Sequence, residues 1–249
     1  MSESQVYVVT GASKGLGRSI CEILASNGFT VVGIARKSNE LSSLEQYLKN
    51  VNPNSTTLSC DLASENQIAS TAEKITHNFP LIHGVIHNAG IIGPVGSMFK
   101  VETNLWNETI QVNLLAVQQL TKLMYNSMVK SQRCRVTTIS SGAAVNSLES
   151  WSAYCTSKAG LEMWTKSLSD EGSKHGISAV SVAPGIVDTE MQATIRSASR
   201  EDFPMVSRFI EFHNNGDLVA PDVVAESLYE LMTNHTMDDS GNRFDVREL

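Results

Sequence analysis

The sequence predicts an α/β protein in which a single doubly wound parallel sheet is flanked by helices. Apolar, β-branched segments alternate with segments of helical periodicity along all 249 residues, with no repeat or low-complexity linker. The runs 31–34 and 85–86 are almost continuously apolar, as expected of strands that are buried on both faces. The length suits one domain with a substantial core, so we treat 1–249 as a single domain of about seven strands.

The expected elements follow the chain in alternating order. Because parallel strands require long crossovers, each expected strand is followed by a helical segment, and ligands are expected at the carboxyl ends of the strands. The expected strands are 5–10, 30–35, 55–60, 82–87, 134–140, 177–183 and 243–246. The expected helices are 15–27, 40–50, 64–78, 104–130, 152–174 and 221–234.

A glycine-rich turn follows the first expected strand. Gly11, Gly15 and Gly17 come after an apolar run and before an apolar-periodic stretch. Glycines permit a tight turn and close backbone approach, and the next helix offers N–H groups to a pyrophosphate. The spacing is G-x-x-x-G-x-G, whereas the general dinucleotide fingerprint is G-x-G-x-x-G. We expect a dinucleotide site here; a glycine-rich connection without a ligand is the alternative.

Tyr154 and Lys158 lie four residues apart in an expected helix, so their side chains share one face. A nearby ammonium favours the phenolate, so we expect the pKa of Tyr154 to fall below its usual value of about 10. Such a tyrosine can exchange a proton with a carbonyl or alcohol oxygen, and Ser141 can hydrogen-bond the same oxygen. The pattern alone also fits a surface tyrosine and a solvated lysine.

Further motifs extend these two observations along nearly the whole chain. In their order and spacing they resemble the short-chain dehydrogenase/reductase family. The resemblance implies a Rossmann-type fold, a nicotinamide cofactor and an oxidoreductase that acts on CH-OH or C=O groups. The residues that carry it are Thr10-Gly-Ala-Ser-Lys-Gly-Leu-Gly17, Cys60-Asp61-Leu62, Asn88-Ala89-Gly90, Asn113, Ser141, Tyr154, Lys158 and Pro184-Gly-Ile-Val-Asp-Thr189.

The resemblance implies a catalytic set of four residues. Ser141 and Tyr154 are expected to hydrogen-bond the substrate carbonyl oxygen, and Tyr154 to donate the proton. Lys158 is expected to lower the pKa of Tyr154 and to bind the nicotinamide ribose. Asn113 is expected to interrupt its helix and to bind a water that links Lys158 to solvent.

The same resemblance assigns the cofactor contacts. Asp61 is expected to hold the adenine amino group beside the Leu62 backbone, and 88–90 to line the adenosine ribose. After the turn at 184–185, Val187 and Thr189 are expected to hold the nicotinamide carboxamide. The expected cofactor-binding residues are Gly11, Ser13, Lys14, Gly15, Leu16, Gly17, Arg36, Asp61, Leu62, Asn88, Ala89, Gly90, Tyr154, Lys158, Pro184, Gly185, Val187 and Thr189.

The end of the second expected strand favours NADP(H) over NAD(H). Ala35 stands where an NAD-preferring enzyme usually places an acid for the ribose 2′-hydroxyl, and Arg36 follows it. Lys14 supplies a second cation near the same region. Two cations without a carboxylate suit a 2′-phosphate. Solvated surface charge is the alternative.

The segments 151–155, 183–192 and 240–249 resemble the sepiapterin reductase branch of the family and its microbial relatives that reduce benzil to benzoin. Asp245 stands four residues after Gly241, as does the pterin-anchoring aspartate of sepiapterin reductases. It is therefore a candidate substrate anchor; a salt bridge with Arg243 or Arg247 is the alternative. The candidate substrate residues are Ser141, Trp151, Met191 and Asp245.

Residues 190–216 are expected to form a substrate lid. A lid after the nicotinamide-binding turn can close over substrate and exclude water. Its apolar side would suit an aromatic ketone or a 1,2-diketone; plain packing or an oligomer contact is the alternative. The residues of that side are Met191, Ile195, Phe203, Met205, Phe209, Ile210 and Phe212.

Composition limits the classes of function. The net charge of −7 argues against nucleic acid as the main partner, and no apolar stretch reaches the length of a membrane span. The four cysteines show no close pairing in the sequence, and the N-terminus enters the first expected strand without room for a signal peptide, so a cytoplasmic protein is expected. His83 and His87 would lie about 13 Å apart on a strand, so no metal site is expected.

We therefore predict an NADPH-dependent carbonyl reductase that acts on a ketone or 1,2-diketone. An NADP-dependent alcohol or sugar dehydrogenase, or a 3-oxoacyl reductase, is the second possibility. A non-enzymatic NADP(H) sensor on the same fold is the third. Helices 104–130 and 152–174 are the family's usual dimerisation surface, so a homodimer or homotetramer is expected.

Overall fold

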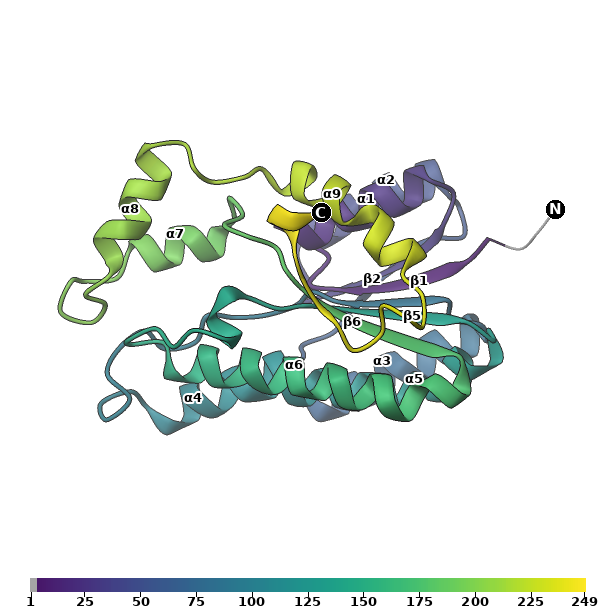
Figure 1. Cartoon of the computed structure of the whole chain (residues 1–249). Helices are drawn as coiled ribbons and strands as arrows, with labels where there is room; N and C mark the ends of the chain where they lie inside the picture. The colour runs from purple at the N-terminus through teal and green to yellow at the C-terminus, as the bar shows by residue number, and fades with distance from the viewer. Residues whose placement is uncertain (1–3) are drawn as a thin grey trace.

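One parallel sheet of seven strands forms the centre of the computed structural model, which describes residues 4–249 (Figure 1). The strand order is β3-β2-β1-β4-β5-β6-β7, and every neighbouring pair is parallel. The predicted α/β fold is confirmed. The strands are β1 Val6–Thr10, β2 Thr30–Ala35, β3 Thr56–Ser59, β4 Gly84–His87, β5 Cys134–Ile139, β6 Ile177–Ala183 and β7 Arg243–Asp245.

Helices cover both faces of the sheet. In Figure 1, α1 (Gly15–Ser26), α2 (Asn39–Val51) and α9 (Pro221–Asn234) lie above it. Below it lie α3 (Glu65–Asn78), α4 (Thr103–Ile110), α5 (Ala116–Lys130) and α6 (Ser152–Gly172). Within residues 4–249, none of the helices combines the length and apolar character that crossing a membrane requires.

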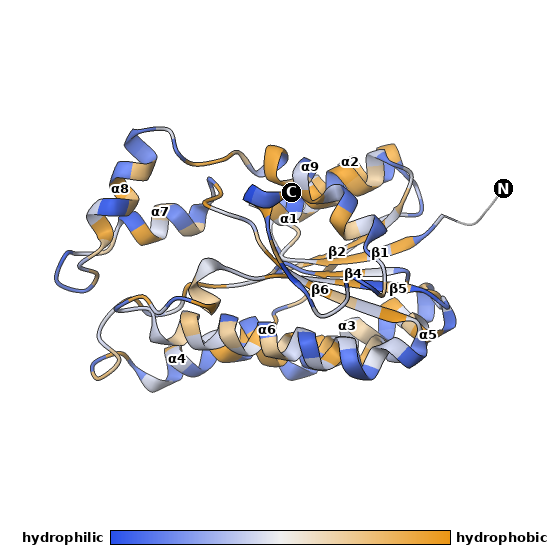
Figure 2. Ribbon diagram, in the orientation of Figure 1, coloured by the Kyte–Doolittle hydropathy of each residue, from blue (hydrophilic) through white to orange (hydrophobic). Residues whose placement is uncertain are grey.

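Alternation along the strands divides the core into two halves. The hydrophobic residues are concentrated in the strands (Figure 2), and adjacent side chains of a strand point to opposite faces. Val9 packs with Leu24 and Leu228 on the face of α1 and α9. Its neighbour Val8 packs on the opposite face with Met124 of α5. Both faces of the sheet are therefore buried, as the apolar strand sequences predict.

The helices α2 and α3 begin where a serine side chain satisfies one of the first N–H groups. The Ser38 hydroxyl accepts a hydrogen bond from the Leu41 backbone N–H at the start of α2. The Ser64 hydroxyl does the same for Gln67 at the start of α3. Pro221 occupies the first turn of α9, where its missing N–H costs nothing.

The strand order reverses between β1 and β4, and this reversal places the ligand crevice. In doubly wound sheets, ligands bind beyond the carboxyl ends of the strands at such a switch point. Beyond these ends lie α7 (Glu190–Arg196) and α8 (Val206–Asn214), both within the predicted lid segment (Figure 1).

The structure divides the helix that was expected over 104–130. A π-helical turn at Gln111–Leu115 separates α4 from α5. Such turns insert an extra residue and are frequent at functional sites. Asn113 lies in this turn, so the expected interruption of the helix at this residue is present.

We predict that Gly84→Ala destabilises the protein. A Cβ at Gly84 would lie 2.1 Å from the ring of Tyr7, which is fully buried on the neighbouring strand β1. Forcing apart a packed core costs about 1–3 kcal/mol. Urea unfolding monitored by circular dichroism should show this loss.

The control for Gly84→Ala is Gly142→Ala, since a Cβ at Gly142 meets no atom within 4 Å. Equal unfolding midpoints for the two variants would contradict the packing argument.

Candidate active site

The glycine-rich turn between β1 and α1 forms a cradle that side chains would fill. Gly11 and Gly15 have φ angles of +68° and +54°, in the region that favours glycine. A Cβ at Gly17 would lie 2.3 Å from the Gly11 carbonyl oxygen. Lys14 begins α1 without a side-chain cap, which leaves the N–H groups of its first turn for a ligand. This geometry fits the pyrophosphate of a dinucleotide.

The loop 88–90 is bound directly to this turn. The Thr10 hydroxyl accepts hydrogen bonds of 3.1 Å from the backbone N–H groups of Asn88 and Ala89. The Asn88 side-chain amide donates to the Thr10 carbonyl at 3.0 Å. Asn88 therefore holds the β1 and β4 strand ends together across the switch point.

Asn113 is fully buried, and its side chain joins the π-helical turn to two other elements. Its Oδ1 accepts from the Ile91 N–H at 2.8 Å, and its Nδ2 donates to the Ile91 carbonyl and the Ser157 hydroxyl, each at 2.9 Å. A Cβ placed on Gly90 would lie 3.5 Å from both Asn113 Oδ1 and Lys158 Nζ. Asn113 and Lys158 thus flank the same loop.

The structure brings Ser141, Tyr154 and Lys158 together. The Ser141 hydroxyl, just beyond β5, lies close enough to the Tyr154 phenol to lower its pKa. Lys158 Nζ lies 5.7 Å from the centroid of the Tyr154 ring and donates to the Ile139 carbonyl at 2.8 Å. Tyr154 and Lys158 occupy successive turns of α6, as their spacing predicts.

Burial controls the protonation of both groups. Burial raises the pKa of Tyr154 to about 12, and the Ser141 hydroxyl only partly opposes this rise. Burial lowers the pKa of Lys158 to about 8, against the attraction of the Glu162 carboxylate. The expectation that the pKa of Tyr154 falls below about 10 is wrong for this structure, because desolvation of the buried phenol raises it.

The predicted 2′-phosphate region lies at the end of β2. Ala35 is the last residue of that strand and is buried, and Arg36 follows it with an exposed side chain. The Lys14 ammonium forms an ion pair with Glu190, the first residue of α7, and both side chains are exposed. Arg36 therefore remains open to solvent, while Lys14 links the glycine-rich turn to α7.

The adenine and nicotinamide ends of the predicted site lie on opposite sides of this turn. Asp61, after β3, accepts a hydrogen bond from the Ala63 N–H, and Leu62 lies beside it. Gly185 follows Pro184 beyond β6 with a φ angle of +74°. Val187 is buried and forms a parallel bridge with Val219.

Thr189, at the predicted nicotinamide end of the site, lies next to the glycine-rich turn. It is the residue before α7, and its side chain lies 3.1 Å from the position of a Cβ on Gly15. The predicted cofactor residues of the first and sixth strand ends are therefore neighbours.

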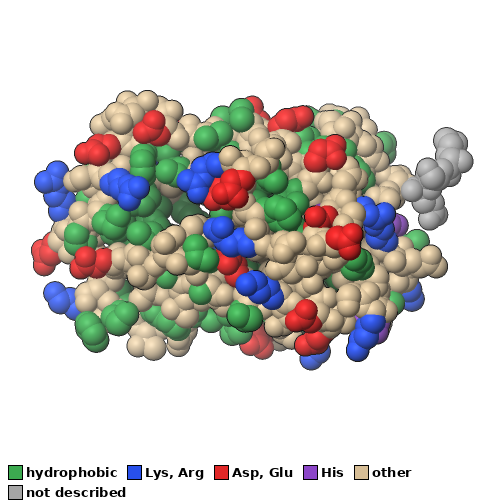
Figure 3. Space-filling view, in the orientation of Figure 1, with side chains coloured by type: hydrophobic (Ala, Val, Ile, Leu, Met, Phe, Trp, Pro, Cys, Tyr) green, Lys and Arg blue, Asp and Glu red, His purple; other side chains and the backbone are tan. Residues whose placement is uncertain are grey.

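An aromatic cluster adjoins Tyr154. Trp151 lies edge-on to Tyr154 with ring centroids 5.7 Å apart, and it stacks on Phe203 at 5.1 Å. Phe209 of α8 packs on both Trp151 and Phe203, and Met191 of α7 lies at the margin. Figure 3 shows hydrophobic side chains gathered at the end of the molecule formed by α7 and α8. The segment 190–216 therefore covers the tyrosine with an apolar surface.

Asp245 is placed beside the site but is already paired. It lies on β7 opposite Ala183, the residue before Pro184. Its two carboxylate oxygens accept from Arg247 at 2.7 and 2.5 Å. These bonds from the Arg247 guanidinium lower the pKa of Asp245 to about 2. The salt-bridge alternative describes this contact, and the role of substrate anchor stays a prediction.

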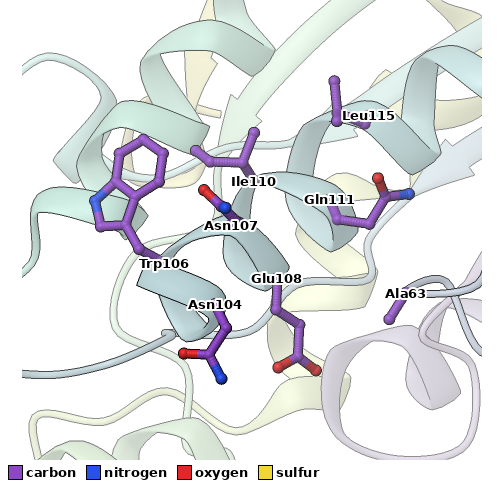
Figure 4. A pocket seen from close by; sticks show the side chains of 8 residues that line it. All are labelled: Ala63, Asn104, Trp106, Asn107, Glu108, Ile110, Gln111 and Leu115. Carbon is purple, nitrogen blue, oxygen red and sulfur yellow. The ribbon is translucent and has the colours of Figure 1, made fainter. Parts of the chain in front are cut away.

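A separate surface pocket lies along the outer side of α4 (Figure 4). The β3–α3 loop contributes Ala63 to the pocket wall, and Ala63 lies next to the predicted adenine contacts Asp61 and Leu62. Gln111, also in the wall, donates to the Leu62 carbonyl at 3.5 Å. The pocket is lined by Ala63, Asn104, Trp106, Asn107, Glu108, Ile110, Gln111 and Leu115.

Sequence reasoning missed four polar residues that support this site. Ser157 binds Asn113, and Glu162 binds both Ser140 and Arg243. Glu162 follows Lys158 at helical spacing, which was a usable signal. Ser140, Ser157 and Arg243 carried no comparable signal, because only the fold brings them to their partners.

Comparison with known families identifies one match. The family model described as short chain dehydrogenase matches residues 5–200.

Curated relatives match most of the chain. A benzil reductase ((S)-benzoin forming) from Bacillus cereus is 36% identical over 235 residues, covering 90% of this chain and 92% of the relative. A benzil reductase of the same description from Bacillus subtilis is 32% identical over 248 residues, covering 98% and 99%. The 3-oxoacyl-acyl-carrier-protein reductase FabG of Escherichia coli is 32% identical over 198 residues, covering 80% of each chain.

Solved structures share the fold. The KRED1-Pglu enzyme has a TM-score of 0.88 and 32% identity, covering 96% of this chain and 100% of the other. An actinorhodin polyketide ketoreductase with NADPH has a TM-score of 0.86 and 25% identity, covering 99% and 97%.

We predict that replacing Lys158 by methionine changes how stability depends on pH. The folded pKa of about 8 lies below the usual value of 10.5, so between these values the unfolded chain binds more protons. The wild type must therefore gain stability over Lys158→Met as pH rises from 8 to 10.5, by on the order of 3 kcal/mol. Urea unfolding at a series of pH values measures this difference.

Lys166→Met is the control for Lys158→Met, because Lys166 is exposed on the same helix. A stability difference between wild type and Lys158→Met that is constant from pH 7 to 10.5 would refute the lowered pKa.

Proposed function

Because this chain belongs to the short-chain dehydrogenase family, which uses nicotinamide cofactors, we propose that it is an NADPH-dependent reductase of ketones or 1,2-diketones. The observation that carries the proposal is the grouping of Ser141, Tyr154 and Lys158 beneath an apolar segment. The relatives of this chain reduce carbonyl groups, and Ser141 and Tyr154 offer two hydroxyl groups to one carbonyl oxygen.

Tyr154 is the proposed proton donor. With a pKa of about 12, its phenol is protonated at neutral pH and is in the form that donates. The Ser141 hydroxyl reaches the same point, so both groups stabilise negative charge on the substrate oxygen as it develops. The apolar surface of Trp151 and Phe203 excludes water around this oxygen, which strengthens these bonds.

Lys158 and Asn113 complete the proton path in this proposal. Below a pH of about 8, Lys158 is an ammonium, which stabilises the phenolate that Tyr154 becomes after it donates its proton. Asn113 keeps the loop 90–91 beside Lys158 through its bonds to Ile91. Lys158 is held at a fixed distance from the phenol by its bond to the Ile139 carbonyl.

The chain's own residues fit NADPH. The cradle of Gly11, Gly15 and Gly17 would hold the pyrophosphate, and Arg36 would bind the 2′-phosphate where Ala35 leaves no competing carboxylate. When bound, the reduced nicotinamide supplies the hydride. The NADPH named with the related ketoreductase structure supports the same choice of cofactor.

The proposed substrate is an aromatic ketone or 1,2-diketone. The benzil reductases align over as much as 98% of this chain, whereas the FabG relative aligns over 80%. The rings of Trp151, Phe203 and Phe209 next to Tyr154 offer a surface on which an aryl group can pack. A 3-oxoacyl thioester is the second candidate, supported by the FabG relative.

The first experiment measures NADPH oxidation by the purified protein. Substrates are benzil, 1-phenyl-1,2-propanedione, sepiapterin and an acetoacetyl thioester, each with NADPH or NADH. Turnover of a diketone with NADPH would support the proposal, and turnover of the thioester alone would favour the second candidate. Absence of turnover with every carbonyl, despite tight NADPH binding, would refute the proposed activity.

We predict that Tyr154→Phe removes turnover but leaves NADPH binding intact. Loss of a positioned proton donor lowers rates by about 10²- to 10⁴-fold. Stopped-flow absorbance gives the rate, and NADPH fluorescence gives the dissociation constant. Phe212→Leu, which alters the outer margin of the aromatic cluster, serves as control. Wild-type turnover in Tyr154→Phe would remove this residue as the donor.

We predict that Arg36→Asp shifts preference towards NADH. A charge-assisted hydrogen bond contributes about 1.5–3 kcal/mol, so kcat/KM for NADPH relative to NADH should fall about 10- to 100-fold. Lys74→Asp makes the same charge change on the exposed side of α3 and should leave the ratio unchanged. An unaltered ratio in Arg36→Asp would exclude this residue from the phosphate site.

The predicted homodimer or homotetramer has support in the apolar side chains exposed on α5 and α6, which include Leu123, Tyr125 and Met163. Light scattering after size-exclusion chromatography should give twice or four times the mass of 27.1 kDa. A monomer at micromolar concentration would refute this prediction.

A further inference from the structure

Three consecutive residues at the end of β5 each interact with a different residue of α6. The Ile139 carbonyl accepts a hydrogen bond from Lys158, and the Ser140 hydroxyl donates one to Glu162. Ser141 lies close enough to Tyr154 to influence its pKa. The three residues of α6 are spaced by four, so they form one row along the helix. Two of these contacts belong to the proposed active site, and the contact of Glu162 has no assigned role.

Glu162 is buried beneath the site and is held from two directions. Its Oε1 accepts from the Ser140 hydroxyl at 2.6 Å and from Arg243 Nε at 2.8 Å. Glu162 is 8% exposed and Ser140 is 2% exposed, so solvent does not compete for these bonds. The carboxylate thereby connects α6, the end of β5 and the edge strand β7.

We propose that Glu162 is a positioning residue for carbonyl reduction: its carboxylate fixes Ser140, and with it Ile139 and Ser141, and it places a negative charge one helical turn from Lys158. This inference rests on the reductase function proposed above. Glu162 itself acts through its neighbours, since the groups that meet the substrate are Ser141 and Tyr154.

Geometry explains how Glu162 orients the catalytic serine. Ser140 and Ser141 are adjacent in the chain, with side chains that point to opposite sides of the extended backbone. The Ser140 N–H is already bound to the Val182 carbonyl at 2.7 Å. The bond to Glu162 fixes the other side of the same residue, so the backbone that leads to Ser141 is held in place. The Ser141 hydroxyl is then oriented by the Ala143 N–H, from which it accepts at 3.1 Å.

Charge explains how Glu162 acts on Lys158. Around the Lys158 ammonium, α6 presents Tyr154 and Glu162, and β7 presents Arg243, which is paired with Glu162. The π-helical turn presents the neutral amide of Asn113, and β5 presents the Ile139 carbonyl. Burial lowers the pKa of Lys158 to about 8, and the negative charge of Glu162 opposes this effect.

The test compares Glu162→Gln with Glu162→Asp in pH–rate profiles of carbonyl reduction at saturating NADPH. Glutamine keeps the shape and removes the charge, so the alkaline limb of kcat should move about one unit to lower pH. Aspartate keeps the charge and should retain a limb close to that of the wild type. Asp170→Asn, an exposed charge change on the same helix, is the matched control.

Ser140→Ala tests orientation separately from charge. It removes the bond to Glu162 and leaves the carboxylate, so kcat should fall about fivefold, the equivalent of one ordinary hydrogen bond, without movement of the alkaline limb. The dissociation constant of NADPH should stay within twofold of the wild-type value for Ser140→Ala and for Glu162→Gln.

A second readout requires no turnover. The measured quantity is the difference in unfolding free energy between a protein with Lys158 and the same protein with Lys158→Met. In the wild type this difference begins to rise near pH 8. When both proteins also carry Glu162→Gln, it should begin to rise about one pH unit lower. If Glu162→Gln and the wild type give the same pH–rate profile and the same pH dependence of stability, the inference about Glu162 is overturned. The reductase proposal would still stand in that case if Tyr154→Phe loses turnover. Conversely, absence of carbonyl reduction by the wild type would refute the reductase proposal alone.

Discussion

The buried ammonium of Lys158 is the group on which the rest of the site depends. Removing a charge from water costs several kcal/mol unless partners compensate, and the lowered pKa of Lys158 expresses that cost. The partners are the Ile139 carbonyl and, along α6, the Glu162 carboxylate. To keep this ammonium in place, the carboxyl end of β5 must meet one face of α6 in a single register.

That register determines the other contacts. Because Lys158 is bound to Ile139, the following residue Ser140 lies beside Glu162, and Ser141 lies beside Tyr154. On the far side, the π-helical turn points Asn113 at Ile91 and Ser157, where a regular helix would have rotated its side chain away. The site is therefore held by two buried polar groups that each have their own partners: the Asn113 amide binds Ile91 and Ser157, and the Glu162 carboxylate binds Ser140 and Arg243.

The apolar end of the molecule has a different physical character. The segment 190–216 meets the site through Phe203 and Phe209, whose rings pack on Trp151, a kind of contact that allows more than one geometry. Its attachment to the cofactor side is an exposed ion pair between Lys14 and Glu190, a kind of contact that contributes little stability. The polar side of the site is thus tightly determined, whereas the predicted lid is held by weaker contacts.

The sequence by itself determined the fold class, the order of the elements and the row of Tyr154 and Lys158, because these depend on local periodicity and spacing. It also indicated a break at Asn113, through the family resemblance. Only the tertiary structure decided that burial raises the pKa of Tyr154, that Asp245 pairs with Arg247, and that Arg243 reaches Glu162. Desolvation and pairing depend on which distant segments the folded chain encloses together, and no local pattern records that.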